Sequence, residues 1–155
     1  MGVSCLGTIR AKLANFGRFG FSKDEILWLF GRSPFLMTLS IEKVQRNMTF
    51  ILGTMKLEAK IILTYPFLLY VNLDTLLKPR VFLVRKIHDM GLILQITGPT
   101  LLRALKMTER RFLKDFVDCH QKDVADELME FYIRTKEVKR LAESSKKCIL
   151  RGFSF

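Results

Sequence analysis

The sequence contains few residues of the kinds that build enclosed chemical sites. Its three cysteines, Cys5, Cys119 and Cys148, are odd in number, lie far apart and form no C-x-x-C spacing. This pattern argues against a disulfide framework and against a zinc site, and it suits a reducing compartment. The two histidines, His88 and His120, have no cysteine or aspartate partner at ligand spacing. We therefore expect neither a metal nor a cofactor.

Catalytic signatures are missing too. The sequence has no glycine-rich phosphate loop. Cys119 and His120 are neighbours, so on a helix they point in different directions and make a poor nucleophile and base. Four acidic residues near the C-terminus fit a solvated helix face better than a metal site; they are Asp123, Asp126, Glu127 and Glu130. We expect a protein that is not an enzyme.

Long apolar runs are also absent. The longest, IILTYPFLLYVNL over 61–73, is too short to span a bilayer and contains Pro66. The opening MGVSCL has Leu6 where a myristoylation signal needs Ser or Thr. The first 22 residues are basic without an acid, as in a transit peptide, but the repeats described below assign them to a folded unit. We expect no transmembrane helix.

Positive charge and apolar residues are plentiful. The 155 residues carry a formal net charge of +11, and 49% of them are hydrophobic. A chain this apolar can bury a core. A folded chain this basic favours a polyanionic partner, either nucleic acid or an anionic membrane surface, although charge can also serve solubility alone.

A short sequence motif occurs three times. RSPFLMTLS over 32–40 returns as TYPFLLYVN over 64–72 and, more loosely, as TGPTLLRAL over 97–105. Self-similarity at a fixed period of this length predicts a repeat protein. The repeated prolines are Pro34, Pro66 and Pro99.

The first repeat predicts a helix, a proline turn and a second helix. Ser22 and Glu25 form a capping box, flanked by a hydrophobic staple of Phe21 and Ile26. The helix should end near Ser33, because a residue before proline avoids the α conformation. The second helix is expected to begin after Ser40 and to bury Val44, Met48, Ile51 and Met55, with Lys43, Arg46 and Asn47 on its other side.

The later repeats follow the same plan. The second has a short helix over 57–64, a turn at Pro66, and a long helix capped by Asn72, kinked at Pro79 and closed by Gly91. Its expected apolar face contains Leu76, Leu83 and Ile87. The third is looser, with a short helix around Leu92–Thr97, a turn at Pro99 and a helix capped by Thr108 that contains Phe112, Leu113, Phe116 and Val117. A last helix over 122–141 should bury Val124, Leu128, Phe131 and Tyr132.

These elements predict an all-α protein, a curved α-solenoid of about three helix, proline turn, helix repeats with a terminal capping helix. Residues 1–20 would be the end of a preceding, truncated repeat. The array would occupy 21–138, and 139–155 would be a basic tail without a predicted fold.

The order of motifs closely resembles plant members of the mitochondrial transcription termination factor (mTERF) family. The segments that carry the resemblance are GFSKDEILWLFGRSPFLMTLSIEKVQRNMTFI, IILTYPFLLYVNLDTLLKPRVFLVRKIHDMGL and MTERRFLKDFV. The resemblance implies stacked repeats of two α-helices and a 3₁₀ helix, no enzymatic activity, and nucleic-acid binding in mitochondria or chloroplasts. The implied roles are transcription and its termination on double-stranded DNA, or alternatively RNA binding in splicing or ribosome assembly. We expect a monomer that binds nucleic acid rather than a membrane.

Cations recur within the repeats and are the candidate nucleic-acid contacts. Twelve places after the three prolines stand Arg46, Lys78 and Arg111, or Lys114 if the third repeat is aligned on Thr108. A row of such cations could follow a phosphate backbone, and further cations could widen it; these are Arg80, Arg85, Lys86 and Arg110. The alternative is a solvated helix face.

Base recognition needs amides, arginines or exposed rings. Gln45 and Asn47 lie near the basic row and are the candidates. Tyr65, Tyr70 and the phenylalanines occupy mostly apolar helical positions, so we assign them to the core rather than to stacking platforms. A different function remains open, a helical scaffold whose basic surface binds an acidic protein.

Overall fold

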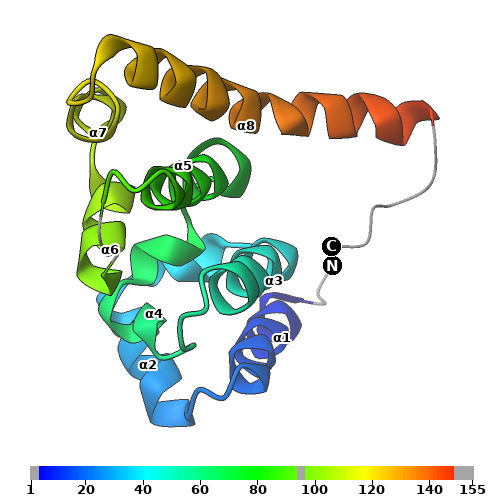
Figure 1. Ribbon diagram of the computed structural model, residues 1–155. Coiled ribbons are helices and arrows are strands. Elements are labelled where there is room, and N and C mark those ends of the chain that lie inside the picture. Colours follow the sequence, from blue (N-terminus) through cyan, green and yellow to red (C-terminus); the bar gives the residue numbers. More distant parts are fainter. Residues whose placement is uncertain (1–3, 94–96, 149–155) are drawn as a thin grey trace. The chain divides into compact units, whose positions relative to one another are not determined.

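The computed structural model describes residues 4–93 and 97–148 of the chain (Figure 1). These residues form α-, 3₁₀- and π-helices and contain no strand, which confirms the all-α prediction. The chain divides into two compact units, residues 1–73 and 74–155. The curved stacking of the repeats and their predicted boundaries stay predictions.

The first unit contains α-helices, two 3₁₀ helices (η1 and η3) and one π-helical turn (η2). In chain order they are α1 (Ser4–Arg18), α2 (Lys23–Arg32), η1 (Pro34–Thr38), α3 (Ile41–Thr49), η2 (Phe50–Thr54), α4 (Ile61–Thr64) and η3 (Pro66–Leu69). The second unit is entered through the π-helical turn η4 (Leu73–Leu77). Its helices are α5 (Lys78–Asp89), α6 (Gly98–Lys106), α7 (Glu109–Phe116) and α8 (Lys122–Cys148).

Local sequence signals set the helix ends of the first repeat as predicted. The Glu25 amide donates to Ser22 Oγ (3.2 Å) and the Ser22 amide donates to Glu25 Oε1 (2.9 Å), which completes the capping box. Helix α2 ends at Arg32, two residues before Pro34. The proline then opens η1, and Ser40 Oγ caps α3 by accepting from the Lys43 amide (3.1 Å).

Two glycines end helices in the left-handed conformation. Gly91 has φ +76°, its amide donates to His88 O (2.9 Å), and the Leu92 amide donates to Ile87 O (3.1 Å). This pair of bonds is the Schellman motif, and it confirms the predicted closure of α5. Gly20, with φ +92°, ends α1 in the same way. A side chain at either position would be strained, since only glycine adopts this conformation at no cost.

The third repeat departs from the prediction. Pro99 lies in the first turn of α6, capped by Thr97, so it opens an α-helix rather than a 3₁₀ turn. Proline is tolerated there because the first helical amides need no partner within the helix. The predicted short helix around Leu92–Thr97 falls partly on residues outside the described ones, and its described residues are not helical. Thr108 caps α7 as predicted.

Each unit has its own core. In the first, Phe16 packs edge-to-face against Phe21 and Phe30, with ring centroids 6.0 and 5.3 Å apart. The predicted inward side chains of α3 and η2 are buried; they are Val44, Met48, Ile51 and Met55. In the second, α5 packs along α8 (Figure 1). Its core residues are Leu83, Val84, Ile87, Ala104, Phe112, Val117, Leu128 and Tyr132.

Three polar side chains are buried among the described residues, and they recur at the repeat period. They are Asn15, Asn47 and Arg80, at most 3% exposed and 32 and 33 residues apart. We call the last two, Asn47 and Arg80, the clasp residues because of the bonds they make. Asn47 Nδ2 donates to three carbonyl oxygens at the end of η3, those of Leu68 (2.8 Å), Leu69 (3.2 Å) and Val71 (3.2 Å).

Arg80 repeats this arrangement one repeat later. Its Nη1 donates to three carbonyl oxygens at the end of α6, those of Ala104 (2.9 Å), Leu105 (3.4 Å) and Met107 (2.6 Å). Counted back from Asn72 in one case and Thr108 in the other, the acceptors stand four, three and one residues earlier. Carbonyls at a helix end have no partner within the helix. Asn47 and Arg80 therefore each satisfy carbonyls at the end of the next proline helix.

The contacts to η1, the first proline helix, are different. Asn15 Oδ1 accepts from Gln45 Nε2 (3.1 Å), and Asn15 lies near Leu36 and Leu39. Here Lys12 makes the contact to the proline helix, through Nζ to Met37 O (2.6 Å).

The π-turn η4 shifts the second repeat by one residue. Asn47 stands seven residues after Ser40, whereas Arg80 stands eight after Asn72, because a π-turn adds one residue to a helix. The buried counterpart of Val44 is consequently Leu77, which is fully buried, and the prediction of Leu76 on the inner face was wrong in register. Pro79 follows at the start of α5, where the missing amide costs little.

Candidate nucleic-acid interface

Arg80 is not a surface cation. Its side chain is 2% exposed, its Nη1 atom is held by the end of α6, and its guanidinium lies 4.7 Å from the Phe112 ring centroid. Its Nη2 atom donates to Glu109 Oε2 (3.2 Å). The prediction that Arg80 widens a phosphate-binding row was therefore wrong, because both ends of its guanidinium are used inside the second unit.

Glu109 is the centre of a charged network behind α7. Its carboxylate accepts from Arg80, from the Tyr132 hydroxyl (3.1 Å) and from Lys136 Nζ (2.7 Å). Burial by itself would raise the pKa of Glu109, but hydrogen bonds from Lys136 and Tyr132 outweigh it, and the pKa lies below its ordinary value of 4.5. The network balances the negative charge of Glu109 locally and connects α5, α7 and α8.

This network should be visible in the acid stability of the protein. A carboxyl with a lowered folded pKa contributes stability above its ordinary pKa of 4.5, and that contribution is lost as the pH falls through the folded value. We expect Glu109→Gln to be less stable than the wild type at pH 7 and to lose less stability than the wild type below about pH 4.5. Urea unfolding followed by circular dichroism from pH 3 to pH 7 measures this. Parallel stability profiles would contradict it.

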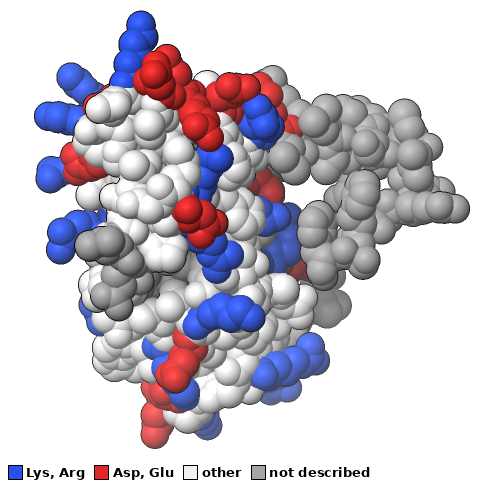
Figure 2. All heavy atoms as spheres, in the orientation of Figure 1, with Lys and Arg blue, Asp and Glu red and all other residues white. Residues whose placement is uncertain are grey.

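The outer face of α7 is basic. Arg110, Arg111 and Lys114 are exposed, while Phe112 on the opposite side is fully buried. Residues three and four apart share a helix face, so Lys114 lies beside both arginines. Arg111 Nε also lies 3.5 Å from Asp115 Oδ2. Figure 2 shows basic side chains projecting around α7 and α6 at the upper left.

Two further exposed cations at the end of α6 were not among the predicted contacts. They are Arg103 and Lys106. The segment RALKMTERRFLK over 103–114 contains five cations and a single acid, Glu109, whose carboxylate is bonded to Arg80 and Lys136. The high density of cations in this segment was the sequence signal from which Arg103 and Lys106 could have been predicted as contacts.

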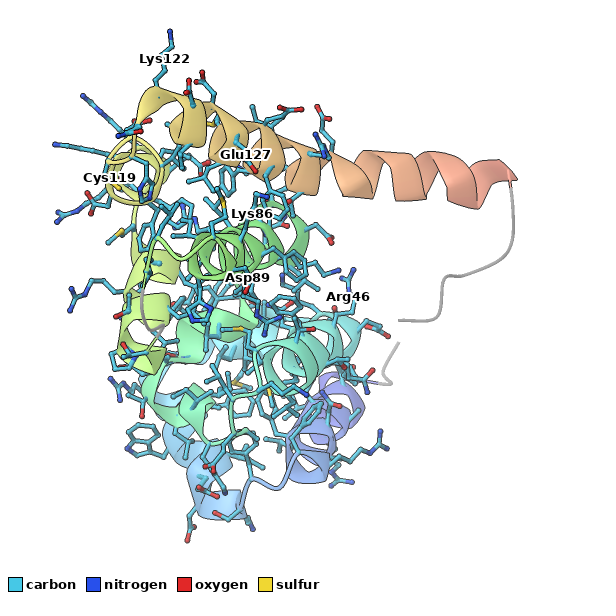
Figure 3. The ribbon with its side chains drawn as sticks, in the orientation of Figure 1. Arg46, Lys86, Asp89, Cys119, Lys122 and Glu127 are labelled. Atoms are coloured by element: carbon cyan, nitrogen blue, oxygen red, sulfur yellow. The ribbon has the colours of Figure 1, made fainter. Side chains whose placement is uncertain are left out.

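The cations of α5 have other partners. Lys86 Nζ lies 3.3 Å from Glu127 Oε1 on α8 and 5.0 Å from the Phe131 ring centroid (Figure 3). Lys78 is partly exposed and pairs with Asp74 (3.5 Å) one turn earlier. Arg85 is exposed. Lys86 therefore holds α5 to α8, which is a structural role.

Arg46 is exposed on α3 of the first unit (Figure 3) and makes no ion pair with a described residue. The shift by η4 places Pro79, rather than Lys78, in the position of Arg46, since each directly precedes a clasp residue. The sequence offset of twelve thus did not mark structurally equivalent positions, although the row as a whole stays a prediction.

Of the two candidates for base recognition, one is buried and one is exposed. Asn47 is fully buried and bound to η3, so its assignment to the solvated side of α3 and to base reading was wrong. Gln45 is exposed and donates to Asn15. Tyr70 and Phe35 are 41% and 58% exposed, so the assignment of these two rings to the core was also wrong.

Other chemistry finds no support in the described residues. No group of three or more His, Cys, Asp or Glu side chains could hold a metal ion there. Cys119 donates through Sγ to Asp115 O (3.0 Å), and partial burial raises the pKa of its thiol. None of the described helices is both long and apolar enough to cross a bilayer.

Comparison with known proteins identifies the family. The mTERF family model matches residues 1–113, which is most of the chain. The matched part includes the three repeated prolines and the start of α7. No curated protein and no solved structure gave a significant match. The mTERF family consists of helical-repeat, nucleic-acid-binding regulators of gene expression in organelles, and enzymatic activity is not known for it. The chain described here belongs to the mTERF family.

Proposed function

We propose that this chain regulates organellar transcription, including its termination, by holding the phosphate backbone of double-stranded DNA on the outer face of α7. The supporting observation is the three exposed cations Arg110, Arg111 and Lys114, beside a Glu109 whose carboxylate is bonded to Arg80 and Lys136. Such cations release counterions from a nucleic acid and so drive salt-dependent binding. We place the chain in a mitochondrion or chloroplast of a plant and expect it to act as a monomer.

The alternative ligand is RNA, in splicing or ribosome assembly. Phosphate contacts position a protein on either nucleic acid without reading its sequence. The face of α7 therefore supports both ligands, and a direct comparison of affinities must choose between them.

Charge reversal on α7 tests the proposal. We expect Arg110→Glu/Lys114→Glu to weaken binding to a labelled DNA duplex by about tenfold or more at 0.1 M salt. The slope of log affinity against log salt should fall by about 2, one for each lost contact. Fluorescence anisotropy over a salt series measures both, with duplex DNA and duplex RNA of one sequence compared in parallel.

The matched control is Lys23→Glu/Lys56→Glu, which makes the same change in net charge at two exposed positions of the first unit. Its effect should be small, with an unchanged salt slope. Equal losses in both double variants would show that net charge, rather than α7, drives binding. Absence of duplex binding by the wild type, with helicity intact, would refute the α7 proposal and favour an acidic protein as the partner of this face.

A further inference from the structure

The first unit exposes several large apolar side chains, in α2 and on its proline turns. Of the seven large hydrophobic residues exposed in the described part of the chain, five belong to this unit: Leu27, Trp28, Phe35, Met37 and Tyr70. Phe35 directly follows Pro34 in η1, and Tyr70 ends η3 one repeat later. Isolated exposed apolar residues need no explanation, but these two rings contact each other.

Phe35 and Tyr70 form an exposed edge-to-face pair. Their ring centroids are 5.4 Å apart, and their planes meet at 82°. In this geometry one ring presents its edge to the other, so neither of its own faces is covered by the partner. At 58% and 41% exposed, the pair presents aromatic surface to solvent.

The backbone around both rings is fixed. The Tyr70 amide donates to Phe67 O (3.1 Å), and the flanking carbonyls of Leu69 and Val71 accept from the clasp residue Asn47. On the other side, the Thr38 hydroxyl donates to Phe35 O (2.6 Å). The pair is thus held by buried and local hydrogen bonds before any ligand arrives, which lowers the entropic cost of binding.

A lysine from another helix is bound to a backbone carbonyl within two residues of each ring. Lys43 Nζ donates to Val71 O (2.6 Å), next to Tyr70, and Lys12 Nζ donates to Met37 O (2.6 Å), two residues after Phe35. Exposed rings combined with cations are the arrangement by which proteins bind single-stranded nucleic acid.

We propose that Phe35 and Tyr70, with Lys12 and Lys43, bind single-stranded nucleic acid by stacking on unpaired bases. This goes beyond the contact proposed for α7, which involves phosphates alone and suits a duplex. Bases inside a duplex already stack on each other and cannot reach the two rings, so this surface selects unpaired strands. An apolar protein segment would use the rings without needing the lysines.

The experiment compares two ligands and two variants of the full chain. The ligands are a fluorescent twelve-residue oligothymidylate and the same strand with abasic sites at alternate positions, which keeps its phosphates. Phe35→Leu/Tyr70→Leu retains apolar area and removes the aromatic faces. We expect this variant to bind the intact strand at least about tenfold more weakly and to bind the abasic strand as the wild type does.

Lys12→Ala/Lys43→Ala should weaken binding to both strands, because phosphates remain in both. Ile133→Ala, at an exposed apolar position of α8, is the control and should change neither affinity. Circular dichroism checks that the variants keep the wild-type helicity.

Unchanged binding of the intact strand by the leucine variant would overturn the stacking proposal, and so would an equal loss on the abasic strand. Either result leaves the α7 proposal intact if the wild type still binds duplex DNA in a salt-dependent way. Conversely, a wild type that binds the intact single strand but no duplex would remove the α7 proposal alone. A ribonucleotide strand in parallel shows whether RNA is preferred.

Discussion

Replacing Arg80 with methionine is expected to lower the free energy of unfolding by about 3 kcal/mol, because it leaves buried polar groups without partners. The carbonyl oxygens of Ala104, Leu105 and Met107 would lose their shared donor, and Glu109 would lose one of its cations. Glu109 is partly exposed and keeps Lys136, which limits the loss. Methionine fills most of the space, so the change tests the hydrogen bonds more than the packing.

Urea unfolding followed by circular dichroism measures the effect of Arg80→Met. Arg110→Met removes a cation from an exposed position of α7 and should change stability by no more than about 0.5 kcal/mol. Arg80→Lys keeps the charge but not the planar fork, so its loss should fall between the two. If Arg80→Met and Arg110→Met were equally stable, Arg80 would not be a clasp.

The second large effect is expected at Asn47. Changing Asn47 to aspartate replaces a buried amide donor with a carboxylate oxygen that faces three carbonyl oxygens. Repulsion and desolvation should together cost about 3 kcal/mol at pH 7. Lys43, bound to the same Val71 carbonyl, would neutralise part of the new charge and keeps the cost from being larger.

The pH dependence distinguishes this mechanism from simple loss of packing. An aspartate buried beside carbonyls should have a raised pKa, so the cost of Asn47→Asp should shrink as the pH falls and the carboxyl regains a proton to donate. Asn72→Asp makes the same chemical change at an exposed position before η4 and should be nearly neutral. A cost for Asn47→Asp that does not vary from pH 7 to pH 4 would argue against the clasp.

The paired clasps also explain why a repeat chain of this kind tolerates irregular lengths. The stretch between Pro99 and the cap Thr108 is three residues longer than the stretch between Pro66 and Asn72. The acceptors of Arg80 nevertheless keep the spacing to the cap that the acceptors of Asn47 have. The number of residues between the accepting carbonyls and the following Asn72 or Thr108 is therefore constant. The number of residues between the proline and those carbonyls varies.

The local structure of this protein could be predicted from its sequence alone. Caps, prolines and glycines act on the backbone within a few residues, so Ser22, Ser40, Thr108 and Gly91 marked helix ends correctly. Helical periodicity likewise identified the buried side of α3 and of α8, and the three proline motifs led to the mTERF family. These signals need no knowledge of distant contacts.

The burial of individual polar and aromatic residues could not be predicted in this way, because it depends on long-range packing. Arg80 and Asn47 read as surface residues on their own helices, but each meets helix-end carbonyls from a segment 21 to 27 residues later in the chain. Phe35 and Tyr70 read as core residues, yet nothing in their own unit covers them fully. The π-turn η4 also moved Lys78 out of register by one residue. Burial depends on what packs against a side chain, and that partner lies outside the local pattern.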